Sequence, residues 1–143
     1  MKNDVFKEKW NISTNSKIPS DIHWPEFSKD EKIATRKVWG KVIEEMSTKG
    51  SFLVGGSADL EPSNVTAGFA KMVGDFSKNN PGGMNFPYGV REFPMGVINN
   101  GIALHGGLLV FGATFFVFAD YERPAIRMRA LQKLPVVSEF THD

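Results

Sequence analysis

The sequence has no cysteine, no long hydrophobic run and almost no net charge, and each absence excludes a class of function. Without cysteine it has no disulfide, thiolate metal ligand or cysteine nucleophile, which fits a reducing cytoplasmic environment. No apolar stretch reaches the roughly 18 residues that a membrane span needs, and residues 1–13 lack the apolar region of a signal peptide. We therefore expect neither secretion nor membrane insertion. A formal net charge of +1 without a Lys/Arg run gives no argument for nucleic acid.

What is present indicates one globular domain. The 143 residues are 41% hydrophobic and 23% charged, which suits a folded core. Residues 1–27 show no clear period, and we interpret them as a linker whose aromatic side chains anchor it to a neighbouring surface. Residues 28–143 alternate between helical and extended patterns without an internal repeat. We therefore expect a linker followed by one domain.

The hydrophobic pattern predicts two buried strands and a third strand, separated by helices. A capping box of Ser28 and Glu31 opens a predicted helix that runs to Met46. The apolar runs at 51–56, 108–116 and 135–140 predict strands. Residues 61–86 predict mostly irregular chain with one short helix, and residues 119–134 a helix interrupted near Pro124. The predicted fold class is α/β, with a mainly parallel sheet covered by helices on both faces.

Three polar or aromatic stretches follow the predicted strands. They read "GGSADL", "GATFF" and "THD". In open parallel sheets ligands bind at the carboxyl ends of the strands, so we expect these stretches to gather at one site. The chain also stops directly after the third strand, which would leave a sheet edge open, and this predicts a domain truncated at its C-terminal end.

The stretch "YGVREFPMGVINNGIALHGG", residues 88–107, places a carboxylate at the start of a predicted helix. Met95, Ile98 and Ile102 recur on one helical face. Gly96, Gly101 and Gly106 indicate that something packs close to the backbone. Spacing alone favours a surface pair of Arg91 and Glu92 at a helix N-terminus, where the helix dipole stabilises a carboxylate. We assign no chemistry to His105, which suits a helix C-terminus.

Taken singly, the other polar and aromatic candidates also have ordinary structural interpretations. Phe115, Phe118 and Tyr121 recur at intervals of three, and such a stripe usually belongs to the core. Asp59 suits a loop cap. The remaining three candidates read most simply as a solvated helical charge, a turn residue and a polar group at a strand end: Arg36, Ser63 and His142.

Several blocks in order resemble one enzyme family. These are "TRK", "GGSADLEPSN", "YGVREFPMGVINNGIALHGG", "FFVFADYERPAIRMRAL" and "LPVVSEFTHD". Together they resemble the transketolases, at the start of the central domain that binds the aminopyrimidine of thiamine diphosphate. Deoxyxylulose phosphate synthases and dehydrogenase subunits share the Arg-Glu turn, but "SADLEPSN" and "THD" resemble transketolase more closely. The implied fold is the thiamin-diphosphate-binding fold, with residues 28–143 forming an incomplete pyrimidine-binding domain.

The resemblance implies a role for each candidate residue. Glu92 would hydrogen-bond the N1′ atom of the pyrimidine, favouring the imino tautomer that removes the proton from C2 of the thiazolium. The implied cofactor-binding residues, of which the aromatic ones stack on the pyrimidine, are Asp59, Phe115, Phe118 and Tyr121. The implied substrate phosphate group is Arg36, Ser63 and His142.

The implied reaction moves a two-carbon ketol unit from a ketose phosphate to an aldose phosphate, as in the pentose phosphate pathway. The diphosphate and its divalent metal, Mg²⁺ or Ca²⁺, would be held by a preceding domain whose motifs are absent here, so we place no metal on this chain. Family members form the active site between the two subunits of a homodimer, so this chain would carry half a site and be inactive alone. Two alternatives remain: a non-catalytic docking or regulatory module, and another thiamine enzyme such as a deoxyxylulose phosphate synthase.

Overall fold

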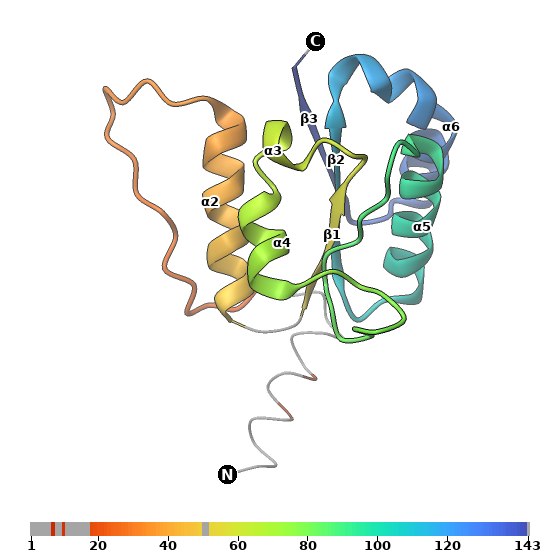
Figure 1. Ribbon diagram of the computed structural model, residues 1–143, viewed down its shortest axis with the longest axis horizontal. Coiled ribbons are helices and arrows are strands. Elements are labelled where there is room, and N and C mark those ends of the chain that lie inside the picture. The colour runs from red at the N-terminus through yellow and green to blue at the C-terminus, as the bar shows by residue number, and fades with distance from the viewer. Residues whose placement is uncertain (1–6, 8–9, 11–17, 50–51, 143) are drawn as a thin grey trace.

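The computed structural model describes Lys7, Trp10, residues 18–49 and residues 52–142 (Figure 1). The start of the predicted linker lies mostly outside the described residues. The elements, in chain order, are α2 (Thr35–Thr48), β1 (Leu53–Ser57), α3 (Glu61–Asn64), α4 (Ala67–Val73), α5 (Glu92–His105), β2 (Leu109–Phe115), the 3₁₀ helix η1 (Phe116–Phe118), α6 (Ala119–Gln132) and β3 (Val136–Thr141).

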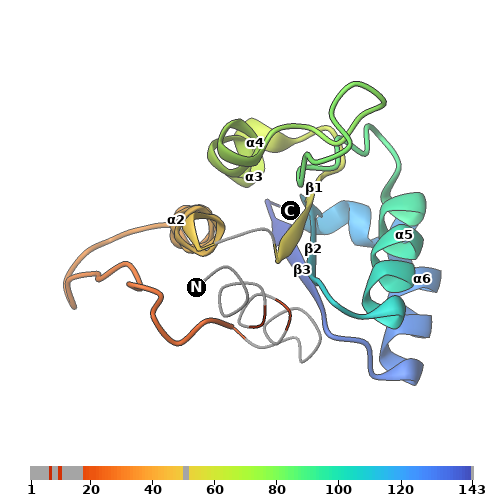
Figure 2. The same cartoon turned by 90° about the horizontal axis from the view of Figure 1, so that it is seen from below.

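The strands form one parallel sheet in the order β1-β2-β3. In the register, Gly55 of β1 lies beside Phe111 of β2, which lies beside Val137 of β3. Figure 2 shows α2, α3 and α4 on one side of the sheet and α5 and α6 on the other. All of β1 and the middle of β2 are buried, as expected for strands covered on both faces. The predicted fold class is confirmed.

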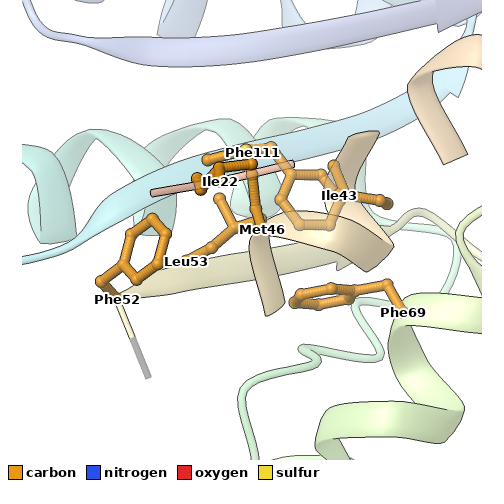
Figure 3. Close-up of a cluster of buried hydrophobic side chains, with 7 residues drawn as sticks. All are labelled: Ile22, Ile43, Met46, Phe52, Leu53, Phe69 and Phe111. Carbon is orange, nitrogen blue, oxygen red and sulfur yellow. The ribbon is translucent and has the colours of Figure 1, made fainter. Parts of the chain in front are cut away.

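The larger hydrophobic core lies between the sheet and α2 and α4 (Figure 3). Phe111 of β2 is fully buried, and its ring meets Phe69 of α4 edge-on with the centroids 5.1 Å apart. The Trp39 ring of α2 makes a second edge-on contact with Phe111 at 5.7 Å. Ile22 also belongs to this core, whereas Trp24 is 48% exposed. Ile22 therefore anchors the described part of the predicted linker to this core, and Pro19 of the same segment is also buried.

The first predicted helix starts later than its capping box indicates. Ser28 and Glu31 do form a turn: the Ser28 N–H donates to Glu31 Oε2 at 3.3 Å, and the Glu31 N–H donates to the Ser28 carbonyl at 3.0 Å. The helix itself begins only at Thr35. Residues 28–32 are exposed, so this turn has no apolar surface to bury. The predicted start was wrong because most helix stability comes from packing rather than from a cap.

Two further predictions about helices are corrected. α6 runs without interruption through Pro124, which stands inside the helix and leaves it without one backbone N–H donor. Residues 61–86 hold two short helices, α3 and α4, where one was predicted. A left-handed residue, Val65 with φ 57°, separates them.

The described residues contain neither a membrane-spanning helix nor a metal-binding cluster. Across Lys7, Trp10, 18–49 and 52–142, no helix has the length and apolar character needed to cross a bilayer. Within the same residues, no three His, Asp or Glu side chains are grouped so that they could hold a metal ion.

Candidate functional site

The loops that follow β1 and β2 and the end of β3 are joined at the carboxyl end of the sheet. The Ala58 N–H donates to the Ala113 carbonyl at 2.9 Å, and the Phe116 N–H donates to the His142 carbonyl at 2.8 Å. Thr141 Oγ1 donates to Asn64 Oδ1 at 2.6 Å and so ties the end of β3 to α3 (Figure 1). The predicted gathering of the three stretches at one end of the sheet is confirmed.

A cavity of about 390 Å³ and a cavity of about 540 Å³ open at this end. The larger one, here called the aromatic cavity, is lined by residues that come from the β1 loop, the start of α5 and the start of α6. They are Ala58, Asp59, Leu60, Val90, Glu92, Phe118 and Tyr121. The structure therefore brings together four residues that the sequence analysis assigned to the catalytic and cofactor-binding set.

Phe115 does not line the aromatic cavity. Its ring stacks on Phe118 with the centroids 5.8 Å apart and the planes 10° from parallel. Phe118 in turn lies 6.1 Å from the Tyr121 ring. Phe115 thus supports the cavity wall from behind, and Phe118 and Tyr121 form the wall.

Asp59 is held in place by the β1 loop. Its φ of 63° lies in the left-handed region, which Asp adopts more readily than most residues. Ser57 stabilises the turn because its Oγ accepts from the Leu60 N–H at 3.0 Å and from Asn64 Nδ2 at 2.8 Å. The loop therefore presents Asp59 at the cavity in a defined conformation.

Glu92 is the first residue of α5 and is only 7% exposed. The Arg91 guanidinium does not pair with it but donates to the Tyr88 carbonyl at 3.0 Å. The surface Arg-Glu pair that spacing alone favoured is therefore wrong. A carboxylate at a helix N-terminus is stabilised by the helix dipole, and Glu92 lies at the wall of the aromatic cavity.

The start of α5 is fixed by buried polar contacts. The Tyr88 hydroxyl donates to Asn99 Oδ1 at 2.5 Å, and Asn99 Nδ2 donates to the Phe111 carbonyl at 3.2 Å. Burial raises the pKa of Tyr88 well above its usual range, so this hydroxyl remains a donor. These bonds attach the helix that carries Glu92 to the central strand.

The predicted close approach at the glycines of α5 is correct at one position. A Cβ on Gly96 would lie 2.7 Å from Ala125 Cβ of α6, so Gly96 lets the two helices touch. A Cβ on Gly101 would meet nothing within 4 Å. Gly106 also has free space but a φ of 81°, which is why glycine ends the helix.

The smaller cavity, here called the polar cavity, lies between α2 and β3. It is lined by Thr35, Arg36, Trp39, Val137, Ser138, Glu139, Phe140, Thr141 and His142. Arg36 and His142 are therefore brought together, whereas Ser63 is not among the lining residues and lies in the short helix α3. The His142 ring lies 4.8 Å from the ring of Phe115, which stacks on the wall of the aromatic cavity.

Sequence reasoning missed Glu139, a buried carboxyl in the polar cavity. Within the described residues neither of its oxygens has a hydrogen-bond partner, and neither does the nearby Trp39 Nε1. Burial raises the pKa of Glu139 to about 8, and the Trp39 N–H opposes the rise without completing a bond of good geometry. The sequence did hold a signal for Glu139, because the alternation along "VVSEFT" places it on the same strand face as Val137 and Thr141.

Glu122 and Arg129 of α6 were also missed. Arg129 donates to Glu122 Oε1 at 2.7 Å, and both side chains are buried. Burial raises the pKa of Glu122, and the Arg129 guanidinium opposes that rise. The signal was a Glu and an Arg seven residues apart, which share one helical face.

A parallel sheet with helices on both faces and cavities at the carboxyl ends of its strands defines the class of α/β ligand-binding domains. The family described as "Transketolase, pyrimidine binding domain" matches residues 31–143. The chain belongs to this transketolase family.

Similar proteins agree with this assignment. The chain is 49% identical over 140 residues to the transketolase of Bacillus subtilis, covering 95% of this chain and 20% of that protein. The transketolase structure from Leishmania mexicana has a TM-score of 0.88 at 33% identity and covers 98% of this chain and 21% of that chain. A Pichia stipitis transketolase complex with sedoheptulose 7-phosphate has a TM-score of 0.87 at 34% identity. That match covers 99% of this chain and 22% of the Pichia chain. The chain spans about a fifth of these relatives' length.

Proposed function

We propose that this chain forms the pyrimidine-binding half of a thiamine diphosphate site in an enzyme that transfers a two-carbon ketol unit between sugar phosphates. The observation that carries the proposal is a buried carboxyl, Glu92, at the wall of an aromatic cavity in a transketolase pyrimidine-binding domain. Transketolase relatives that are about five times longer than the aligned region support a site completed by other parts of the protein or by a second subunit.

The aromatic cavity fits an aminopyrimidine ring. Its volume of about 540 Å³ is sufficient for such a ring, and Phe118 and Tyr121 offer aromatic faces for stacking. Glu92 supplies one carboxyl, which is the group that can share a proton with a ring nitrogen. When bound, thiamine diphosphate supplies a thiazolium carbon that acts as nucleophile and electron sink.

The chain's own residues would bind, orient and hold a proton. Glu92 would hold the proton shared with the N1′ atom, since its burial limits exchange with water. Phe118 and Tyr121 would keep the ring against Glu92, and Phe115 would hold Phe118 in place. Asp59 would make polar contact at the mouth of the same cavity.

The polar cavity would bind the phosphate of the sugar. Arg36 contributes a permanent charge with fork geometry, and His142 contributes a ring nitrogen. Ser63 has weaker support as a phosphate ligand, because it lies outside the lining of this cavity. Binding of a phosphate remote from the reacting carbons would position those carbons. The relative solved with sedoheptulose 7-phosphate supports sugar phosphates as the substrate class.

The remaining parts of the proposal concern the rest of the protein. A divalent metal would bind the cofactor diphosphate on another domain, and a homodimer would join the two halves of each site. The chain alone would be inactive. The cytoplasmic location expected from the cysteine-free composition stays a prediction that cell fractionation would test.

The decisive experiment replaces Glu92 by Gln in the complete protein. We expect turnover to fall by about 10²–10⁴-fold at saturating thiamine diphosphate, because Gln keeps the shape but cannot exchange the proton. Turnover would be measured as transfer from a ketose phosphate to an aldose phosphate, and cofactor affinity by quenching of intrinsic fluorescence. The matched control is Glu31→Gln, which removes an exposed carboxyl at the turn before α2. Turnover within threefold of the native value would refute the role of Glu92.

A further inference from the structure

We propose that Glu139 sets the pH range in which the polar cavity binds the phosphate of the sugar, because the cavity takes up a phosphate dianion readily only while this carboxyl is uncharged. The inference rests on the proposed function and deepens it, since it assigns a specificity-determining residue to the phosphate site. It concerns three side chains that line one cavity: Glu139 of β3, Arg36 of α2, and His142, which follows β3.

The first observation is that Glu139 is a buried residue in the lining of the polar cavity. It is 9% exposed. Side chains alternate along a strand, so Glu139 shares a face of β3 with Thr141, whose hydroxyl bonds Asn64 of α3. This is the side of the sheet on which α2 and α3 lie (Figure 2). Its neighbour on β2 is Ala113, whose methyl group offers no hydrogen bond. The carboxyl is therefore enclosed without being satisfied by the sheet.

The second observation is that the Glu139 carboxyl is unpaired. Within the described residues both of its oxygens are buried without a hydrogen-bond partner. The Trp39 N–H approaches it without completing a bond of good geometry, and is itself buried and unpaired. Removing an unpaired carboxylate from water costs far more than removing a neutral carboxyl. The geometry therefore favours the protonated form of Glu139, and burial accordingly raises its pKa to about 8.

The third observation concerns the charges around Glu139. The lining residues that can carry positive charge are Arg36 and His142. The uncharged neighbours on this face, from α2, β2 and α3, are Trp39, Ala113 and Asn64. Within the described residues neither Arg36 nor His142 forms an ion pair with Glu139. The charge of Arg36 is therefore available to an anion that enters the cavity.

The consequence is a linkage between phosphate binding and the proton on Glu139. A phosphate bound by Arg36 would share a cavity of about 390 Å³ with Glu139, where little water separates the charges and salt screens them weakly. A neutral Glu139 leaves Arg36 to attract the dianion. An ionised Glu139 repels the dianion and offsets the charge of Arg36. Affinity for phosphate should therefore be full below about pH 8 and fall as Glu139 ionises above it.

The test measures two constants in the complete protein between pH 7.5 and pH 9.5, an interval chosen to span the raised pKa of about 8. They are KM for a ketose phosphate donor and the inhibition constant of inorganic phosphate. A phosphate monoester loses its second proton near pH 6, below this interval. We expect both constants of the native protein to rise by about three- to tenfold. Glu139→Gln, which cannot ionise, should lack that rise. Because the other titratable groups are common to both proteins, the difference between the curves belongs to Glu139.

A second variant decides the question if Glu139→Gln does not fold. The Trp39 N–H lowers the pKa of Glu139, so Trp39→Phe should move the rise in both constants to higher pH. The matched control is Glu31→Gln, which removes an exposed carboxylate from the turn before α2 and should keep the native rise. For a donor without phosphate, the pH dependence of KM should be the same in the native protein and in Glu139→Gln.

Two results would overturn the inference. One is the same rise in the native protein and in Glu139→Gln. The other is a gain of phosphate affinity in Glu139→Gln that is equal at every pH, which would mean that Glu139 is ionised throughout. Arg36→Gln separates the inference from the proposed function. If it leaves both constants at their native values, the proposed phosphate site fails; if it raises them while Glu139→Gln keeps the native pH dependence, only the inference about Glu139 fails.

Discussion

At the scale of single residues, burial rather than residue type decides which charged side chains matter. Glu31 and Glu139 are both carboxylates in the same domain, but the first is exposed in a turn and the second is buried in the polar cavity. The sequence assigned roles to Arg36, Asp59 and Glu92 only through the resemblance of their motifs to a family, since taken singly each has an ordinary structural interpretation. It could not identify Glu122 and Glu139, because a pattern treats isolated charges in a helix or strand as solvent-facing.

Glu139 should make the protein less stable as the pH rises. Its pKa is raised from 4.5 to about 8 in the folded state, so the folded state binds a proton that the unfolded state has lost. The contribution of Glu139 to the free energy of unfolding is therefore fully present below about pH 4.5. It is lost as the pH rises from there toward about 8, at no more than about 1.4 kcal/mol per pH unit.

The measurement is urea unfolding of the complete protein between pH 5 and pH 9, an interval chosen to span the raised pKa of about 8. The native protein should lose stability over this interval more steeply than Glu139→Gln, which cannot ionise. Glu31→Gln should follow the native curve, because that carboxyl is exposed. Parallel curves for the native protein and Glu139→Gln would show that Glu139 does not titrate in this range.

At the scale of secondary structure, the ends of the elements depend on packing against the rest of the fold, which the sequence pattern does not show. β1 and β2 were predicted from apolar runs that are buried in the sheet, whereas β3, which was also predicted from its apolar run, is mostly half-buried or exposed. The start of α2 was misplaced because the turn at Ser28 has no surface to pack against. The interruption predicted at Pro124 was wrong: α6 continues through the proline, on either side of which Glu122 and Ala125 are buried. Local chemistry thus predicted the elements, while tertiary contacts set their ends.

The α5–α6 contact provides a matched pair of glycine substitutions. Gly96→Ala should destabilise the domain by about 1–3 kcal/mol, because its Cβ would lie 2.7 Å from Ala125 Cβ and 2.8 Å from Glu122 Oε1. Gly101→Ala, in the same helix but with nothing within 4 Å, should stabilise it by up to about 1 kcal/mol.

Urea unfolding at one pH measures both changes. The opposite signs are the essential part of the prediction, since helix propensity alone would stabilise both variants. A Gly96→Ala variant as stable as Gly101→Ala would mean that α5 and α6 can separate without cost.

At the scale of the whole molecule, the two cavities are adjacent because the sheet is parallel. Parallel strands deliver all three loops to one end, so the loop after β1, the start of α6 and the end of β3 meet there. The sequence predicted this convergence through the fold class. It could not predict the division into an aromatic and a polar cavity, because that depends on Phe115 standing between Phe118 and His142. The placement of Ser63 outside the polar cavity likewise required the tertiary structure.

Because the polar cavity is separate from the aromatic cavity, replacing Arg36 should affect only donors that carry a phosphate. Arg36→Gln should raise KM for a ketose phosphate donor by about tenfold or more, since it removes a charged hydrogen-bond donor from the polar cavity. KM for a donor that lacks phosphate should stay within twofold, because the aromatic cavity is untouched. Ser63→Ala is the matched control, with a smaller effect expected because Ser63 does not line that cavity. Equal loss of affinity for both donors in Arg36→Gln would assign Arg36 to general stability, and a Ser63→Ala effect as large as that of Arg36→Gln would place the phosphate closer to α3 than to α2.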